Sequence, residues 1–208
     1  GGSDSQVIGG GCNGYAFQGL IIGGTGNTVR NIKITGVHLN NYTAEVAGGA
    51  AIRFETTTLL EGVTVDKVTA NKVSVGSDGF AFSMGASTTA RNNVIRGLHA
   101  NAGDVESTGS GTAFASGIVG GVAFEDCDLY GWRTPYNIGT ASKISVNGGS
   151  VGNFSTGATG WAFYSNGDRN IFRNVSVRNI NTSARLDAAS TNNLVINQII
   201  TPIPATIN

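Results

Sequence analysis

A six-residue pattern recurs along the chain, and it limits the possible folds more than any other feature of the sequence. Its form is apolar, any, apolar, polar, turn residue, apolar, with copies about 19 to 31 residues apart. The copies are Ile32–Val37, Val63–Val68, Asn93–Leu98, Val122–Cys127, Val175–Ile180 and Leu194–Ile199, with a weaker copy at Ile144–Gly149. Apolar residues at i and i+2 share one face of a strand, and the polar and turn residues allow a bend. Each copy therefore predicts one strand and one corner of a coil.

A second short strand of the form Gly-x-Ala-Phe recurs between these copies. Its members are Gly14–Phe17, Gly79–Phe82, Gly111–Phe114 and Gly160–Phe163, with Ala51–Phe54 as a looser one. Pairs such as Asn92-Asn93 and Asn192-Asn193 precede the first strand and indicate side-chain ladders between stacked turns. Constant coils joined by variable loops predict an all-β fold, a right-handed single-stranded parallel β-helix of about seven to eight coils.

The predicted β-helix spans residues 1–200, and residues 201–208 form an extended C-terminal tail because Pro202 and Pro204 cannot donate to a ladder. The alternative is an antiparallel sandwich, which would show hairpin signals between successive strands. Asn13-Gly14, Asn147-Gly148 and Asn166-Gly167 are such signals. Three such pairs are too few for a sandwich, and the six-residue repeat favours the solenoid.

Composition excludes several classes of function. The 13 basic and 13 acidic side chains cancel and charged residues make up 12% of the chain, which argues against a nucleic-acid partner. No apolar run is long enough for membrane insertion. His38 and His99 occupy the same place in alternate repeats, roughly 10 Å apart at strand spacing, too far to share one metal ion. We therefore expect no metal and no cofactor, and surface positions for both histidines.

The Asn-rich coils, the Val-x-Val strands and the Gly-x-Ala-Phe returns resemble the pectate-lyase-like right-handed β-helix superfamily, and within it bacteriophage tailspike and tail-appendage domains. The resemblance implies a homotrimeric protein, on a virion tail or extracellular, that binds or cleaves cell-surface polysaccharide. The chain departs from the lyases of this fold. Where they carry Arg-x-Pro-x-x-Arg, it has Arg133–Ile138, with Ile138 in place of the second arginine. The polygalacturonase segments Asn-Thr-Asp, Asp-Asp and Gly-His-Gly are absent, so no family catalytic residue is carried over.

Carboxylates are the candidate catalytic groups. Glycoside hydrolysis uses two carboxylates about 5 to 9.5 Å apart. Asp104 and Glu106 lie in the most polar insertion, and Asp126 and Asp128 flank the inward Cys127 at one corner, near Lys67 and Gly97 of the coils below. The alternative is that these are solvated turn residues, because turns favour Asp for backbone reasons.

Aromatic residues are the candidate substrate-binding groups, because sugar rings stack on Tyr and Trp. Tyr130, Trp132, Arg133 and Tyr136 form one compact segment, and Trp161 comes from the next coil. The alternative is that these rings plug the solenoid or pack between protomers. Three functions follow: recognition of host polysaccharide, depolymerisation by a hydrolase or lyase, and a structural spacer or adhesin stalk without activity.

Overall fold

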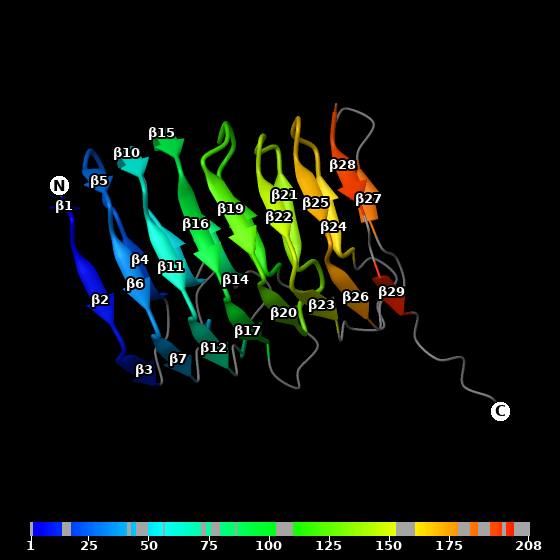
Figure 1. Cartoon of the computed structure of the whole chain (residues 1–208), viewed down its shortest axis with the longest axis horizontal. Helices are drawn as coiled ribbons and strands as arrows, with labels where there is room; N and C mark the ends of the chain where they lie inside the picture. Colours follow the sequence, from blue (N-terminus) through cyan, green and yellow to red (C-terminus); the bar gives the residue numbers. More distant parts are fainter. Residues whose placement is uncertain are drawn as a thin grey trace.

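The computed structural model describes residues 2–13, 18–40, 43–44, 50–55, 57–71, 74–75, 80–85, 87–102, 110–152, 161–178, 184–186, 192–196 and 199–201. All regular structure in these residues is β, and the strands pair in parallel with their neighbours one coil away. The coils stack along one axis, with the first strands of the chain and the last strand, β29, at opposite ends of the stack (Figure 1). The predicted all-β parallel solenoid is confirmed, and its right-handed sense stays a prediction.

Two long sheets run the length of the solenoid, each with eight strands. The first long sheet consists of β2 (Gln6–Ile8), β6 (Lys33–Thr35), β11 (Thr64–Asp66), β16 (Asn93–Arg96), β19 (Val122–Glu125), β22 (Ser145–Asn147), β25 (Ile171–Arg173) and β28 (Leu194–Ile196). The second long sheet consists of β3 (Gly11–Asn13), β7 (His38–Asn40), β12 (Thr69–Asn71), β17 (His99–Asn101), β20 (Asp128–Tyr130), β23 (Ser150–Gly152), β26 (Ser176–Arg178) and β29 (Ile199–Thr201).

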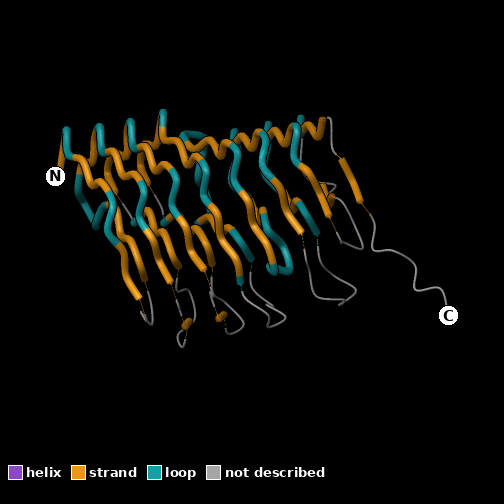
Figure 2. The backbone as a smooth tube through the Cα atoms, turned by 60° about the horizontal axis from the view of Figure 1, so that its bottom comes forward, coloured by secondary structure: helices purple, strands orange, loops and turns teal. Residues whose placement is uncertain are grey.

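Shorter sheets close the remaining sides of the coils. One contains β1 (Gly2–Ser3), β5 (Thr28–Arg30), β10 (Thr57–Glu61) and β15 (Ser87–Arg91), and another contains β4 (Gln18–Ile22), β9 (Ala50–Phe54), β14 (Phe80–Met84) and β18 (Thr112–Phe114). The others are β21 (Tyr136–Gly139), β24 (Phe163–Ser165) and β27 (Ala184–Leu186), and the pair β8 (Thr43–Ala44) and β13 (Ser74–Val75). Figure 2 shows these strands and the loops between them repeating from one coil to the next.

The repeat predicts the register of most of the first long sheet. Ile34 pairs with Val65, Val65 with Ile95, and Ile95 with Phe124, as the aligned copies require. These four side chains are buried, so one inward column of apolar residues follows the axis.

Two predicted copies are wrong in register. Val146 pairs with Phe172, so Val175 is a corner residue ahead of β26 rather than the start of a copy. The corner residue Val175 and the inward residue Val177 of β26 are also two positions apart, so they give the same apolar i, i+2 spacing as two inward residues of one strand. Phe172 in turn pairs with Val195, which moves the last copy by one residue, because Leu194, Val195 and Ile196 are all apolar and show no alternation.

The corner between the two long sheets uses at least one residue with positive φ at each of the levels described below. Gly36, Lys67, Gly97, Asp126 and Gly148 have φ values of 67°, 52°, 59°, 50° and 74°. This conformation is easy for glycine and costs other residues energy, with Asn and Asp the least penalised. The turn position of the sequence pattern therefore requires a residue that can adopt positive φ. Asp126 occupies this position and lies in the column above Lys67 and Gly97, as predicted.

A buried asparagine supports the corner that precedes the first long sheet. The Asn93 amide donates to the carbonyl oxygens of Leu60 at 3.0 Å and Gly121 at 2.8 Å, and its oxygen accepts from the Val63 N–H at 3.0 Å. One side chain thus joins three successive coils. Asn193 has a related role, because its oxygen accepts from the N–H of Asn170 at 2.7 Å. Both asparagines thus join coils through backbone groups, and the contacts at these two positions are not the predicted ladder of stacked side chains.

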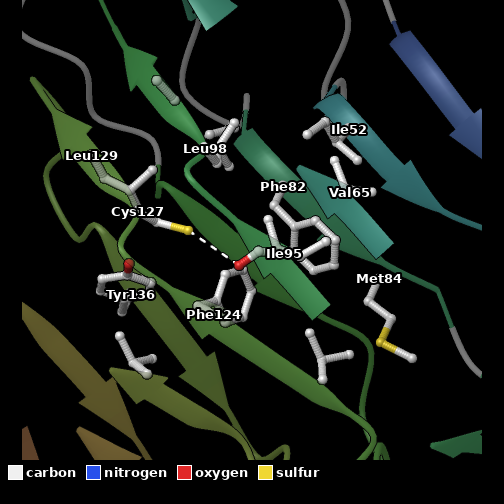
Figure 3. Close-up of a cluster of buried hydrophobic side chains, with 14 of the residues drawn as sticks. Ile52, Val65, Phe82, Met84, Ile95, Leu98, Phe124, Cys127, Leu129 and Tyr136 are labelled. Carbon is white, nitrogen blue, oxygen red and sulfur yellow. Dashed lines mark hydrogen bonds between the residues drawn. The ribbon is translucent and has the colours of Figure 1, made fainter. Parts of the chain in front are cut away.

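Aromatic rings fill the middle of the solenoid. Phe82 lies edge-on to Phe124 with centroids 5.3 Å apart, and Phe124 lies edge-on to Tyr136 at 5.7 Å. Figure 3 shows these rings packed between inward side chains of neighbouring coils, together with Cys127, whose thiol donates to the Ile95 carbonyl oxygen at 3.4 Å. The inward positions thus form one continuous core along the axis.

Candidate functional site

The outward surface of the second long sheet carries mostly polar side chains in the strands from β7 to β26. In each three-residue strand from β7 to β26 the middle side chain is buried, so the first and third positions face outward. We call these outward positions the polar face: His38, Asn40, Thr69, Asn71, His99, Asn101, Asp128, Tyr130, Ser150, Gly152, Ser176 and Arg178.

The polar face differs from the outward surface of the first long sheet. It holds amides, hydroxyls, imidazoles and one phenol, and its fixed charges are Asp128 and Arg178. The corresponding positions of the first long sheet, from β6 to β25, mix charged and aliphatic residues: Lys33, Thr35, Thr64, Asp66, Val94, Arg96, Ala123, Glu125, Ser145, Asn147, Ile171 and Arg173. The two faces therefore offer different chemistry on the same scaffold.

Four side chains of the polar face form one connected cluster around Asp128. The Ser150 hydroxyl donates to the Asp128 carboxylate at 2.5 Å, and Tyr130 hydrogen-bonds to Ser150 through its hydroxyl. Because Ser150 has one proton and gives it to Asp128, Tyr130 is the donor of the second bond. The His99 ring nitrogen Nδ1 lies 3.5 Å from the other carboxylate oxygen of Asp128. We call His99, Asp128, Tyr130 and Ser150 the Asp128 cluster.

The strand register explains this cluster. His99, Asp128 and Ser150 are directly paired first positions of β17, β20 and β23, so they form one column at strand spacing. Tyr130 occupies the third position of β20 and reaches across to the column of Ser150. The parallel stacking, rather than any local loop, brings these residues together.

The cluster suits ligand binding better than nucleophilic catalysis by serine. In serine triads the hydroxyl donates to an imidazole, which the carboxylate orients. Here the Ser150 hydroxyl donates to Asp128, His99 contacts Asp128 rather than Ser150, and Ser150 is only 9% exposed. The side chains of Asp128 and His99 are 38% and 47% exposed, so solvent and ligands reach them. The cluster presents a carboxylate, an imidazole and an aromatic ring at the surface.

The polar face continues toward the N-terminal coils. The His38 ring nitrogen Nδ1 is hydrogen-bonded to the Thr69 hydroxyl at 2.7 Å, and Thr69 separates His38 from His99 in the column. The predicted common edge of the two histidines is thus confirmed. A shallow hollow of about 250 Å³ next to His38 is lined by Gly10, Gly11, Cys12, His38 and Asn40.

Two predicted substrate-binding residues are wrong. Trp132 and Tyr136 are completely buried, so neither ring can stack on a sugar. Tyr136 packs against Phe124 and Phe163. Trp132 and Tyr136 both belong to the hydrophobic core, because burial of large aromatic surfaces stabilises the fold. The alternative in which these aromatics plug the solenoid describes them correctly.

The other predicted site residues lie apart from the Asp128 cluster or outside the described chain. Asp126 is exposed at the corner, and Arg133 is half-buried between β20 and β21. Trp161 is half-buried next to β24, which belongs to another sheet, and stacks on Tyr164 with centroids 5.7 Å apart. Asp104 and Glu106 lie outside the described residues. Of the predicted residues, Asp128 and Tyr130 are the two that the structure brings together.

Sequence analysis missed His99 and Ser150 as members of a site, although the signal was available. Each follows the last apolar residue of its repeat copy or its equivalent, as Asp128 does. When the repeat copies are aligned with one another, His99, Asp128 and Ser150 fall at the same position.

Within the described residues, no group of three or more His, Cys, Asp or Glu side chains is placed to hold a metal ion. The described part of the chain also contains no helix with the length and hydropathy of a membrane span. Comparison of the chain with protein-family models, with curated proteins and with solved structures finds no match.

Proposed function

We propose that the polar face binds an extended polysaccharide along the axis of the solenoid. The Asp128 cluster carries this proposal. Sugars are recognised by carboxylates and amides that hydrogen-bond to their hydroxyls and by aromatic rings that cover their apolar faces. Asp128 and Tyr130 supply a carboxylate and a ring at one level, and Asn101 supplies an amide at the level below.

The repetition of the face suits a polymer. Neighbouring parallel strands lie about 4.8 Å apart, so outward groups recur at that interval along the axis. Thr69 and His99, for example, occupy the same position in consecutive coils. A polymer that lies along the axis presents hydroxyls at regular intervals to these groups. Binding is then the sum of several weak contacts.

Binding to a panel of bacterial surface polysaccharides, measured by array and then by calorimetry, tests the proposal. We expect Asp128→Asn and Tyr130→Ala each to weaken binding about tenfold or more, equal to about 1.4 kcal/mol. Asp66→Asn, the same change on the outward surface of the first long sheet, should leave affinity unchanged. Binding that survives both polar-face changes, or no binding to any polysaccharide, would reject the proposal, and the second result would favour a structural spacer.

Cleavage of the same polymer is a second candidate, and it is favoured by the contact between His99 and Asp128. The exposed His99 imidazole lies 3.5 Å from the Asp128 carboxylate, and imidazole and carboxylate are the side chains that most often act as general acid and base. A hydrolase would release new reducing ends and a lyase would release an unsaturated product. Either product should disappear in Asp128→Asn and persist in Asp66→Asn. Binding without product would limit the function to recognition.

The resemblance to tailspike and appendage domains adds a context to the proposal: a homotrimer on a virion tail or outside the cell that recognises a host polysaccharide. Light scattering of the full chain tests the trimer directly. A stable monomer would remove the trimer from the proposal and leave the binding face unaffected.

A further inference from the structure

The fixed charges of the polar face have opposite signs and lie at two separate levels. Asp128 pairs with Ser150 in the next coil, and Ser150 pairs with Ser176 in the coil after that, where Arg178 ends the strand. The two charges are therefore two coils apart, roughly 10 Å along the axis. A polymer long enough to span them meets an anion at one sugar and a cation further along.

Arg178 is exposed and its side chain is held across its strand. Its Nε donates to the Ser176 hydroxyl at 3.2 Å, which directs the guanidinium group along the same outward surface. No carboxylate in the described part of the chain forms an ion pair with it. A guanidinium has five N–H donors in a planar fork and favours carboxylate, sulfate or phosphate oxygens.

No side chain stands between Tyr130 and Arg178 in their column. The intervening residue is Gly152, and a Cβ atom there would lie 2.8 Å from the carbonyl oxygen of Arg178. A larger residue would thus require the backbone to move. The phenol ring and the guanidinium are consequently the two outward groups that border this level of the column.

We infer that the polymer is partly acidic: some sugars carry an anionic substituent, which Arg178 binds, and the sugar at Asp128 carries none. This inference rests on the proposed polysaccharide function and specifies its substrate class. An anionic substituent next to Asp128 would meet a carboxylate of like charge, whereas one next to Arg178 gains a charge-assisted hydrogen bond.

Chemical neutralisation of the bound polymer tests the inference. The probes are each polysaccharide that binds in the panel and the same polysaccharide after carboxyl reduction or desulfation. We expect neutralisation to weaken binding to the unchanged protein about tenfold, and Arg178→Gln to bind both forms equally. Arg173→Gln, an exposed arginine on the neighbouring strand of the same coil, is the matched control and should retain the preference for the acidic form.

A second arm tests the carboxylate. Polygalacturonate has an acid group on every sugar, so it should bind weakly to the unchanged protein and several-fold more tightly to Asp128→Asn. The inference is overturned if neutralised polymers bind as well as native ones, or if Arg178→Gln keeps the acidic preference. Binding with no charge preference would reject this inference alone, whereas no binding to any polysaccharide would reject the proposed function as well.

Discussion

Tyr136 and Tyr130 lie close together in the chain but on opposite sides of the sheet wall. The Tyr136 hydroxyl is completely buried and finds no hydrogen-bond partner among the described residues, whereas the Tyr130 hydroxyl donates to Ser150. A buried hydroxyl without a partner costs about 1 to 3 kcal/mol of desolvation. The phenol hydroxyl therefore has opposite effects on stability at these two positions.

Phenylalanine at each position should show this difference. We expect Tyr136→Phe to raise the free energy of unfolding by about 1 kcal/mol, because it removes the unpaired hydroxyl and keeps the ring. Tyr130→Phe should lower it by about 0.5 to 1.5 kcal/mol, because a hydrogen bond is lost. Urea denaturation of both variants measures the two effects. A loss of stability in Tyr136→Phe would show that its hydroxyl has a partner.

The same comparison explains which site residues the sequence could predict. Asp128 and Tyr130 belong to one strand, so period-two alternation correctly puts both on the outer surface. Gly131 follows with φ of 77°, and this turn ends the alternation before Trp132. Proximity in the chain therefore stops indicating a common surface at that glycine, which is why the predicted aromatic segment divides between core and surface.

At the level of the corner elements, glycines with similar backbone angles have different surroundings. Gly149 and Gly117 both have positive φ, 78° and 81°. A Cβ atom on Gly149 would overlap the carbonyl oxygen of Cys127 in the coil below, whereas one on Gly117 would meet nothing within 4 Å. The first glycine is required by packing between coils and the second by its own backbone conformation alone.

Alanine at these two corners separates the two causes. Both changes incur the left-handed penalty of about 1 to 2 kcal/mol. Gly149→Ala should cost at least a further 2 kcal/mol, because the backbones of two coils must separate. Thermal and denaturant unfolding of the pair measure the difference. Equal losses in the two variants would mean that the corner relaxes without disturbing the coil below.

Strand elements were predictable where apolar and polar residues alternate and a turn residue follows. Ile34 and Val65 satisfy both conditions, and their pairing agrees with the repeat. The return strands were less predictable in register: Phe82 pairs with Ile52 and with Thr112, two residues away from the predicted alignment on Phe54 and Phe114. A shift of two keeps the same face inward, so hydrophobicity alone cannot distinguish the two registers.

For the whole molecule, each coil contacts only the coils on either side of it, and the stability of such a stack is close to a sum over coils and their interfaces. Phe124 lies in the middle of the inward column of the first long sheet. Its ring contacts Phe82, which precedes it in the chain, and Tyr136, which follows it. It therefore couples the two halves of the solenoid.

Removal of this ring should weaken the coupling. We expect Phe124→Ala to cost about 3 to 5 kcal/mol and to broaden unfolding into two stages, because the halves no longer unfold together. Ile34→Ala, toward the N-terminal end of the same column, should cost about 2 to 5 kcal/mol and keep a single transition. Hydrogen exchange would locate the stages. A single sharp transition in Phe124→Ala would show that the long sheets alone maintain the coupling.

The two cysteines of this stack have opposite accessibility. Cys127 is buried between coils, and burial raises the pKa of its thiol from 9.0 to about 12, so the reactive thiolate is scarce while the solenoid is intact. Cys12 is exposed near the first coil. A maleimide reagent at neutral pH would therefore attach to the folded chain at one end only. The solenoid could be anchored upright by that end with its flank open to solution, and any later reaction at Cys127 would record how often the stacked coils separate.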